Sequence, residues 1–155
     1  MIAQKLSAAN FPVPRPLLYC SDASIIGTPF YATEYVEGRI LTNLNGVSTI
    51  EKSLLLQEVA KALAHLHSIS LSYLGLGDLQ SETSQYQTLN KKLYNTYKLH
   101  ETKISTNVED LLYWLPLNSP VKSESDNLCL VHGDISIDKV IFHPTEPKIL
   151  AIVDW

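Results

Sequence analysis

The chain has 155 residues, of which 45% are hydrophobic and 18% charged, and its formal net charge is −4. This length is enough for a domain with a hydrophobic core, and the balance of apolar and charged residues excludes a disordered or collagen-like chain. The basic residues do not form the dense cluster that contact with a nucleic-acid backbone requires, so nucleic acid is not expected as a partner.

The first forty residues predict a short helix followed by two strands. Residues 2–9 have a helical pattern that Asn10 and the three following prolines bring to an end, because proline lacks an amide donor and favours extended geometry in the residue before it. Residues 17–20 and 30–36 are rich in aliphatic and aromatic side chains and are separated by turn residues. We expect these two segments to pair as a hairpin.

The middle of the chain is predicted to be helical. Ser48 and Glu51 form a capping box, in which the Ser48 hydroxyl accepts an orphan amide and the Glu51 side chain reaches back. The helix that starts there has a stripe of apolar residues at helical spacing: Leu55, Val59, Ala62, Leu63 and Leu66. A second helix is expected over residues 82–102, and a short third helix over 110–115, where Pro116 would stop it. Residues 119–127 are polar and predict an exposed loop.

The last thirty residues predict three short strands, over residues 128–131, 140–142 and 148–153. The turn residues 143–147 separate the last two strands, which should form a hairpin.

Cys20 and Cys129 lie far apart, each among apolar neighbours, so buried reduced thiols are expected rather than a disulfide. No apolar run reaches membrane-spanning length, and the first residues do not resemble a secretory signal. An intracellular setting is therefore expected, with cytoplasm, mitochondrion and peroxisome not distinguished.

The chemistry is concentrated in His132-Gly133-Asp134 and in Asp154, twenty positions further along the chain. Gly133 permits a tight turn that places Asp134 at the tip of a loop, and the predicted hairpin returns Asp154 to the same edge. We therefore expect the two carboxylates to face one cleft. In phosphoryl transfer, one such aspartate orients or deprotonates a hydroxyl and the other holds magnesium. His132 is expected to support the loop through hydrogen bonds.

An ordered set of motifs carries a resemblance to a known family. The motifs are Val13-Pro14-Arg15-Pro16, Gly27-Thr28-Pro29-Phe30-Tyr31, residues 34–39, Leu63-Ala64-His65-Leu66-His67, Trp114-Leu115-Pro116, residues 131–134, residues 141–147 and Val153-Asp154-Trp155. Over nearly its whole length the chain resembles the aminoglycoside phosphotransferase family. It is most similar to the kinase-like domain at the front of acyl-CoA dehydrogenase family members ten and eleven.

The resemblance implies an α+β, protein-kinase-like fold. Residues 1–36 would be a remnant of the small lobe that ends in the hinge, and residues 37–155 would be an incomplete large lobe. By the same resemblance Asp134 is the catalytic aspartate with His132 beside it, and Asp154 is the magnesium ligand. The hinge residues Glu34, Tyr35 and Val36 would meet the adenine of ATP. His65 and His67 would belong to a scaffold helix, and their i, i+2 spacing points them in different directions.

The implied activity is the phosphorylation of a small-molecule hydroxyl with ATP and Mg²⁺, and the nearest relatives suggest a hydroxyacyl-CoA as acceptor. A C-terminal acyl-CoA dehydrogenase domain is expected in the full gene. The sequence departs from the family at Lys139, where asparagine is expected as a magnesium ligand. An ammonium has no lone pair, so it cannot ligate a cation and would repel one. Alternatively, a lysine can contact a phosphate directly. The neighbouring Asp138 is interpreted as a surface charge or turn contact.

A second departure is that the sequence contains no glycine-rich phosphate loop and no strand lysine with its glutamate partner; these would lie before Met1. The chain is therefore expected to be a fragment cut at both ends that is inactive by itself. Two rival functions stay open. One is a non-catalytic interaction or regulatory remnant. The other is a metal-dependent hydrolase using His132, Asp134 and Asp154, which would need more ligands than the sequence offers at tight spacing.

Overall fold

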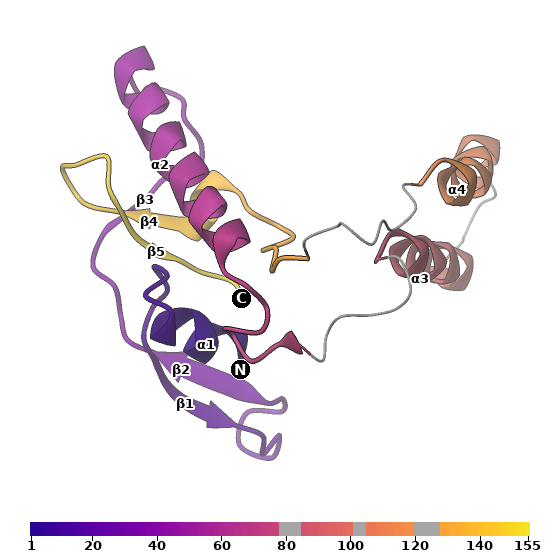
Figure 1. Ribbon diagram of the computed structural model, residues 1–155, viewed down its shortest axis with the longest axis horizontal. Helices are drawn as coiled ribbons and strands as arrows, with labels where there is room; N and C mark the ends of the chain where they lie inside the picture. The colour runs from indigo at the N-terminus through magenta and orange to yellow at the C-terminus, as the bar shows by residue number, and fades with distance from the viewer. Residues whose placement is uncertain (78–84, 101–104, 120–127) are drawn as a thin grey trace. The chain divides into compact units, whose positions relative to one another are not determined.

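The computed structural model describes residues 1–77, 85–100, 105–119 and 128–155 (Figure 1). The chain divides into two compact units, the first formed by Met1–Gly77 together with Cys129–Trp155 and the second by Asp78–Leu128. Mixed helix and sheet agree with the predicted α+β class. The first unit carries every residue that the sequence predicts for the site.

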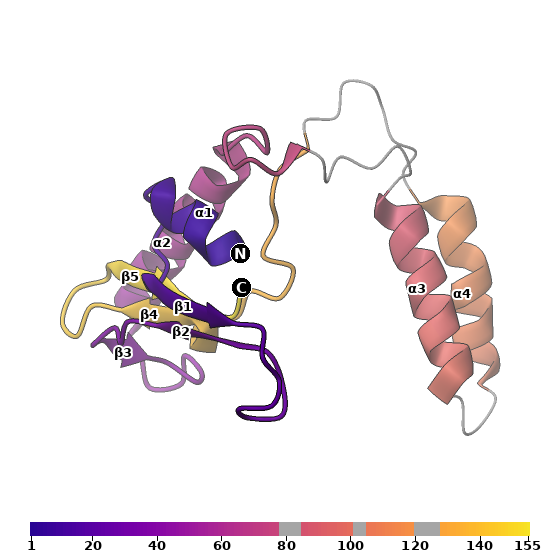
Figure 2. The ribbon, with the colours of Figure 1, turned by 90° about the horizontal axis from the view of Figure 1, so that it is seen from below.

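The core of the first unit is a three-stranded antiparallel sheet in the order β3-β4-β5. Its strands are β3 (Arg39–Ile40), β4 (Val140–Phe142) and β5 (Ile149–Ile152). All three residues of β4 are buried, because this central strand is covered on both faces. The helix α2 (Thr49–Ser68) runs beside this sheet in both views (Figures 1 and 2) and buries Leu55 and Leu66 completely. The predicted C-terminal hairpin is thus confirmed, whereas β3 was not predicted.

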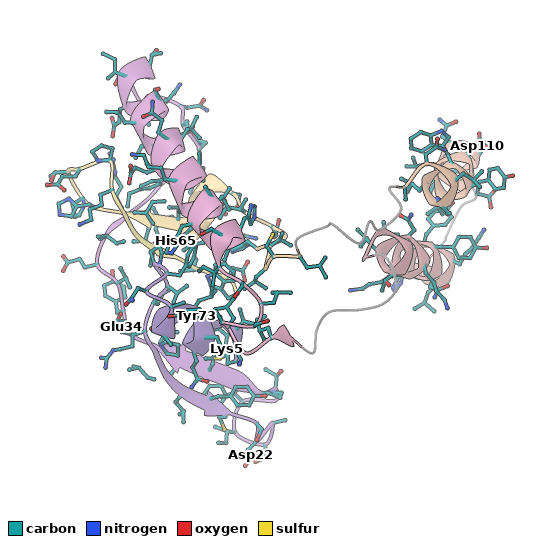
Figure 3. All side chains as sticks on the ribbon, in the orientation of Figure 1. Lys5, Asp22, Glu34, His65, Tyr73 and Asp110 are labelled. Carbon is teal, nitrogen blue, oxygen red and sulfur yellow. The ribbon has the colours of Figure 1, made fainter. Side chains whose placement is uncertain are left out.

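A second antiparallel pair joins β1 (Pro16–Cys20) and β2 (Phe30–Thr33), as the sequence predicts. The register shifts between Pro16 and Leu18. The second strand ends at Thr33 rather than at residue 36. The next residue, Glu34, still donates its amide to the carbonyl of Arg15 at 2.9 Å, and its carboxylate also binds Arg15, the residue before β1. In Figure 3, Glu34 and Asp22 lie at opposite ends of this pair.

The helix α1 (Ile2–Ala8) packs against β1 and buries Ala3 and Leu6. The helix ends at Ala8 and is capped by Ala9. Asn10 follows with a φ of 58°, the left-handed conformation that asparagine tolerates better than most residues. Phe11 then enters the core. The chain is thereby anchored beside the C-terminal strand, where the amide of Ile152 donates to the carbonyl of Pro12 at 2.8 Å.

The capping box of α2 forms only in part. The Ser48 hydroxyl accepts the Glu51 amide at 3.2 Å, as predicted. The Glu51 carboxylate does not serve the cap but pairs with the Arg39 guanidinium of β3, with Nη1 and Oε1 2.8 Å apart. The Glu51 side chain therefore binds Arg39 of β3, a strand that was not predicted, instead of completing the capping box.

The second unit contains α3 (Gln85–His100) and α4 (Thr106–Asn118), which pack against each other. The ends of the helix predicted over 82–102, and most of the loop predicted over 119–127, lie outside the described residues. The third predicted helix, 110–115, is longer than expected and continues through Pro116. Pro116 lacks the amide that would donate to the carbonyl of Leu112, so the helix loses one backbone hydrogen bond near its C-terminal end. The side chains of Asn118 and Ser119 donate to the carbonyls of Trp114 and Leu115, which lie in the last turn.

Three smaller findings complete the fold. The strand expected over 128–131 is wrong: Cys129 makes an isolated antiparallel bridge with Ser70. The two cysteines are free, but they are half-buried rather than fully buried. Among the helices of the described residues, none is both long enough and apolar enough to span a bilayer.

Candidate active site

The loop before β4 contains a tight turn at Gly133, a position that requires the conformational freedom of glycine. Gly133 has a φ of +85°, a region that residues with a Cβ rarely adopt. The turn lifts Asp134 to the tip of the loop, and 83% of its side chain is exposed. A carboxylate held in this way is accessible to a reactant from solution.

His132 ties this loop to the end of β5. Its Nε2 atom lies 2.9 Å from the carbonyl oxygen of Val153, and its Nδ1 accepts a long hydrogen bond of 3.4 Å from the amide of Asp134. These contacts require the proton on Nε2, because a carbonyl can only accept and the Asp134 amide can only donate. One ring nitrogen thus contacts the loop's own backbone and the other contacts the backbone at the end of β5, so His132 supports the loop through hydrogen bonds.

Two aromatic residues that the sequence analysis did not assign to the site support His132. The Trp155 ring lies against His132, with centroids 4.6 Å apart, and its Nε1 donates to the carbonyl of Ile152 at 2.8 Å. Phe11 meets the edge of Trp155 at 5.6 Å and also contacts His65 of α2. The only signal in the sequence was the aromatic character of positions 11 and 155, which does not reveal that they meet.

Asp154 follows β5 in a left-handed conformation, with a φ of 72°. Aspartate is one of the few residues besides glycine that visits this region with some frequency. The preceding amide, that of Val153, donates to the carbonyl of Lys139 at 2.9 Å. The end of β5 and the short 3₁₀ turn η2 (Ile137–Lys139) are therefore held side by side.

Lys139 lies between the two predicted site carboxylates. Its Nζ atom forms ion pairs with Oδ2 of Asp134 and, at 3.0 Å, with Oδ2 of Asp154. Only 16% of the lysine side chain is exposed, against 83% and 66% for the two aspartates. Hydrogen bonds to Asp134 and then to Asp154 raise the pKa of Lys139 above its usual range, so the ammonium stays charged at neutral pH. The structure brings the two carboxylates together, with a cation of the chain's own between them.

This arrangement does not fit a magnesium ion. Mg²⁺ requires oxygen ligands in near-octahedral geometry, whereas Lys139 offers an ammonium at the centre of the carboxylate pair. Within the described parts of the chain, no group of three histidine, cysteine, aspartate or glutamate side chains could hold a metal. Asp138 is not a substitute, since its carboxylate is bound by Ser136, a contact that also lowers its pKa.

The predicted hinge lies directly after β2. The Glu34 carboxylate accepts the Arg15 amide at 3.0 Å and its Nε at 3.3 Å. The Arg15 amide is also the main reason why the pKa of Glu34 lies below its usual range. Tyr35 is strongly exposed and Val36 is half-buried. The Glu34 side chain thus fastens this segment to Arg15, the residue that precedes β1.

Comparison with known proteins identifies the family. The model of the phosphotransferase enzyme family matches residues 1–155, the full length of the chain. The chain belongs to this family. Over 99% of its length it is similar to a putatively assigned aminoglycoside phosphotransferase from Ralstonia eutropha JMP134, with a TM-score of 0.83 and 34% identity, and it spans 47% of that chain. The fold is therefore protein-kinase-like.

The curated relatives are much longer proteins. The chain is 38% identical to acyl-CoA dehydrogenase family member 11 of Rattus norvegicus, and the match covers 99% of the chain and 20% of the relative. It is 35% identical to acyl-CoA dehydrogenase family member 10 of Mus musculus, with 99% of the chain and 14% of the relative covered. The expected resemblance to both proteins is confirmed.

Proposed function

We propose that this chain is part of a phosphotransferase domain that, in its complete form, transfers a phosphoryl group from ATP to the hydroxyl of a small molecule. The observation that carries the proposal is the geometry at Asp134, an exposed carboxylate at the tip of a loop braced by His132 and Trp155. Such a carboxylate can accept the proton of an incoming hydroxyl or orient that hydroxyl for attack. Membership of the phosphotransferase family supports this assignment.

In this proposal the chain's own residues have separate roles. Asp134 is the catalytic residue, and His132 is a positioning residue that holds the loop to β5. The segment Glu34, Tyr35 and Val36 is the hinge that meets the adenine of ATP. It ends a small-lobe part at residues 1–36, and a large-lobe part follows at 37–155. Magnesium would ordinarily neutralise the phosphates, with Asp154 at the family's metal-ligand position. No step is assigned to it, because the Lys139 ammonium lies between Asp134 and Asp154.

We further propose a hydroxyacyl-CoA as the acceptor. The support is the kind of protein in which the related segment occurs, since two of the relatives are named acyl-CoA dehydrogenases. Because the chain spans 20% or less of these relatives, we also propose that it works within a longer protein containing an acyl-CoA dehydrogenase domain. A phosphotransferase and a dehydrogenase in one protein would then act on the same class of thioester.

The test is a turnover assay on the full-length protein with ATP and a panel of hydroxyacyl-CoAs of different chain length, read by mass spectrometry of the phosphorylated product. Asp134→Asn should lower the turnover number by about 10²- to 10⁴-fold, since general-base catalysis contributes that much. Asp110→Asn is the matched control, because Asp110 is an exposed carboxylate on α4 (Figure 3). Equal rates for wild type and Asp134→Asn would contradict the proposed role.

A non-catalytic kinase-like regulatory domain is the second candidate, and one observation favours it. The two carboxylates that a phosphotransferase uses are both engaged by Lys139. On this alternative, the full-length protein would make no phosphorylated product with any acceptor, and Asp134→Asn would leave its dehydrogenase activity unchanged. The metal-dependent hydrolase is not supported, because Nε2 of His132 is directed at the carbonyl of Val153.

A further inference from the structure

The loop and β5 bring two carboxylates and one ammonium into contact, and the lysine is the most deeply covered of the three. We propose that Lys139 is a built-in cation that occupies the place of a divalent metal between Asp134 and Asp154, so that this site does not bind one. The inference uses the proposed function only to identify Asp154 as the family's metal-ligand position. It concerns cation binding and does not depend on phosphoryl transfer.

Backbone hydrogen bonds hold Lys139 in the position that places its ammonium between Asp134 and Asp154. The amide of Lys139 donates to the carbonyl of Ser136 at 3.1 Å, and its carbonyl accepts the amide of Val153 at 2.9 Å. Lys139 is therefore held at both backbone groups, directly beside the strand end that carries Asp154. With the stem covered, the head group lies between the two carboxylates.

Charge explains why a metal would be kept out. Two carboxylates and one ammonium leave a single net negative charge at the site, instead of the two that would attract a dication. A metal ion would also have to displace an ammonium that remains tethered a few ångströms away and repels it. The ammonium adds no lone pair in return, whereas the amide oxygen of an asparagine at this position would supply one.

The experiment measures Mn²⁺, a spectroscopic stand-in for Mg²⁺, by the electron paramagnetic resonance signal of the free ion during titration of the full-length protein. Wild type should bind no Mn²⁺ at this site, so its titration should be unaffected by Asp154→Asn. Lys139→Asn should bind the ion at least about tenfold more tightly than wild type. Lys139→Met should bind with intermediate affinity, because it removes the positive charge without adding an oxygen.

Two controls isolate the site. Lys148→Asn makes the same change at an exposed lysine of the β4–β5 hairpin and should leave the wild-type result unchanged. Lys139→Asn combined with Asp154→Asn should lose the gained affinity. Circular dichroism of each variant checks that the fold is retained.

Two outcomes would overturn the inference. One is Mn²⁺ binding by wild type that Asp154→Asn abolishes, a result that needs no Lys139 variant and therefore stands even if those variants misfold. The other is failure of folded Lys139→Asn and Lys139→Met to bind more tightly than wild type, since Lys139 would then not be what excludes the metal. Either result can occur with or without phosphorylated product in the turnover assay, so the two proposals fail separately.

Discussion

The first unit contains two antiparallel strand pairs of similar length that differ in their surroundings. In the β4–β5 pair, Val140, Phe142 and Ile152 are almost completely buried. In the β1–β2 pair, the consecutive residues Leu17, Leu18 and Tyr19 are all exposed, and so is Tyr31. Both pairs are rich in apolar and aromatic residues, yet only the β4–β5 pair is part of the core.

The difference in burial between the two pairs determines how firmly each holds the site residues attached to it. Lys139 and Asp154 are attached to the ends of the β4–β5 pair, in which every residue of β4 and the last two residues of β5 are buried. The Glu34 segment is attached to the open pair and is fastened by hydrogen bonds and an ion pair with exposed Arg15. Burial of the β4–β5 pair fixes the backbone to which Lys139 and Asp154 are attached, whereas the predicted hinge depends on polar contacts that water can replace.

The largest loss of stability is expected from a substitution in the buried β4–β5 pair. Phe142→Ala removes a side chain with no exposed surface from the central strand, and should lower the free energy of unfolding by about 3–5 kcal/mol through lost burial and the cavity left behind. Tyr31→Ala, the corresponding aromatic truncation in the open pair, should cost about 1 kcal/mol or less. Urea denaturation followed by circular dichroism measures both. Equal losses would show that the two pairs do not differ in packing.

A smaller loss of stability is expected from a substitution at Gly38, where the backbone passes close to β4. A Cβ atom on Gly38 would lie 2.5 Å from Cγ2 of Ile141 and 2.6 Å from the carbonyl oxygen of Phe142. Because a backbone oxygen in a packed strand cannot move aside cheaply, Gly38→Ala should cost about 1–3 kcal/mol. At Gly77 the nearest atom is 3.9 Å away, so Gly77→Ala serves as the control. A melting temperature that falls equally in both variants would contradict the close approach as the cause.

The smallest effect concerns the open pair and depends on pH. The Arg15 amide lowers the pKa of Glu34, so the folded state favours the charged carboxylate. This contribution is present above the ordinary glutamate pKa of about 4.3 and is lost as the pH falls through the lowered value. Thermal melts between pH 7 and pH 3 should show that Glu34→Gln removes a small part of the acid dependence. Glu37→Gln, which changes an exposed neighbouring carboxylate, is the matched control variant. High salt should weaken the Glu34 effect.

The sequence predicted those parts of the molecule whose causes are local. Ser48 starts α2, Asn10 and the prolines after it follow the end of α1, and the turn at 143–147 joins β4 to β5. These features could be predicted because capping and turn chemistry act over a few residues. The pairing of β3 with β4 depends on residues about a hundred positions apart, and no local pattern encodes it. The same holds for Lys139. Its identity raised the question of metal binding, but its position between Asp134 and Asp154 followed only from the meeting of η2 with the end of β5.

The contact between Trp155 and His132 gives the protein an optical signal of its own. The chain has two tryptophans, and the other, Trp114, is an exposed residue of α4 in the second unit. With Trp114 replaced by phenylalanine, the remaining indole fluorescence would come from a ring that touches the histidine of the loop and donates to the carbonyl of Ile152. Any event that moves the loop away from β5 would change the emission of this ring, without a dye or label.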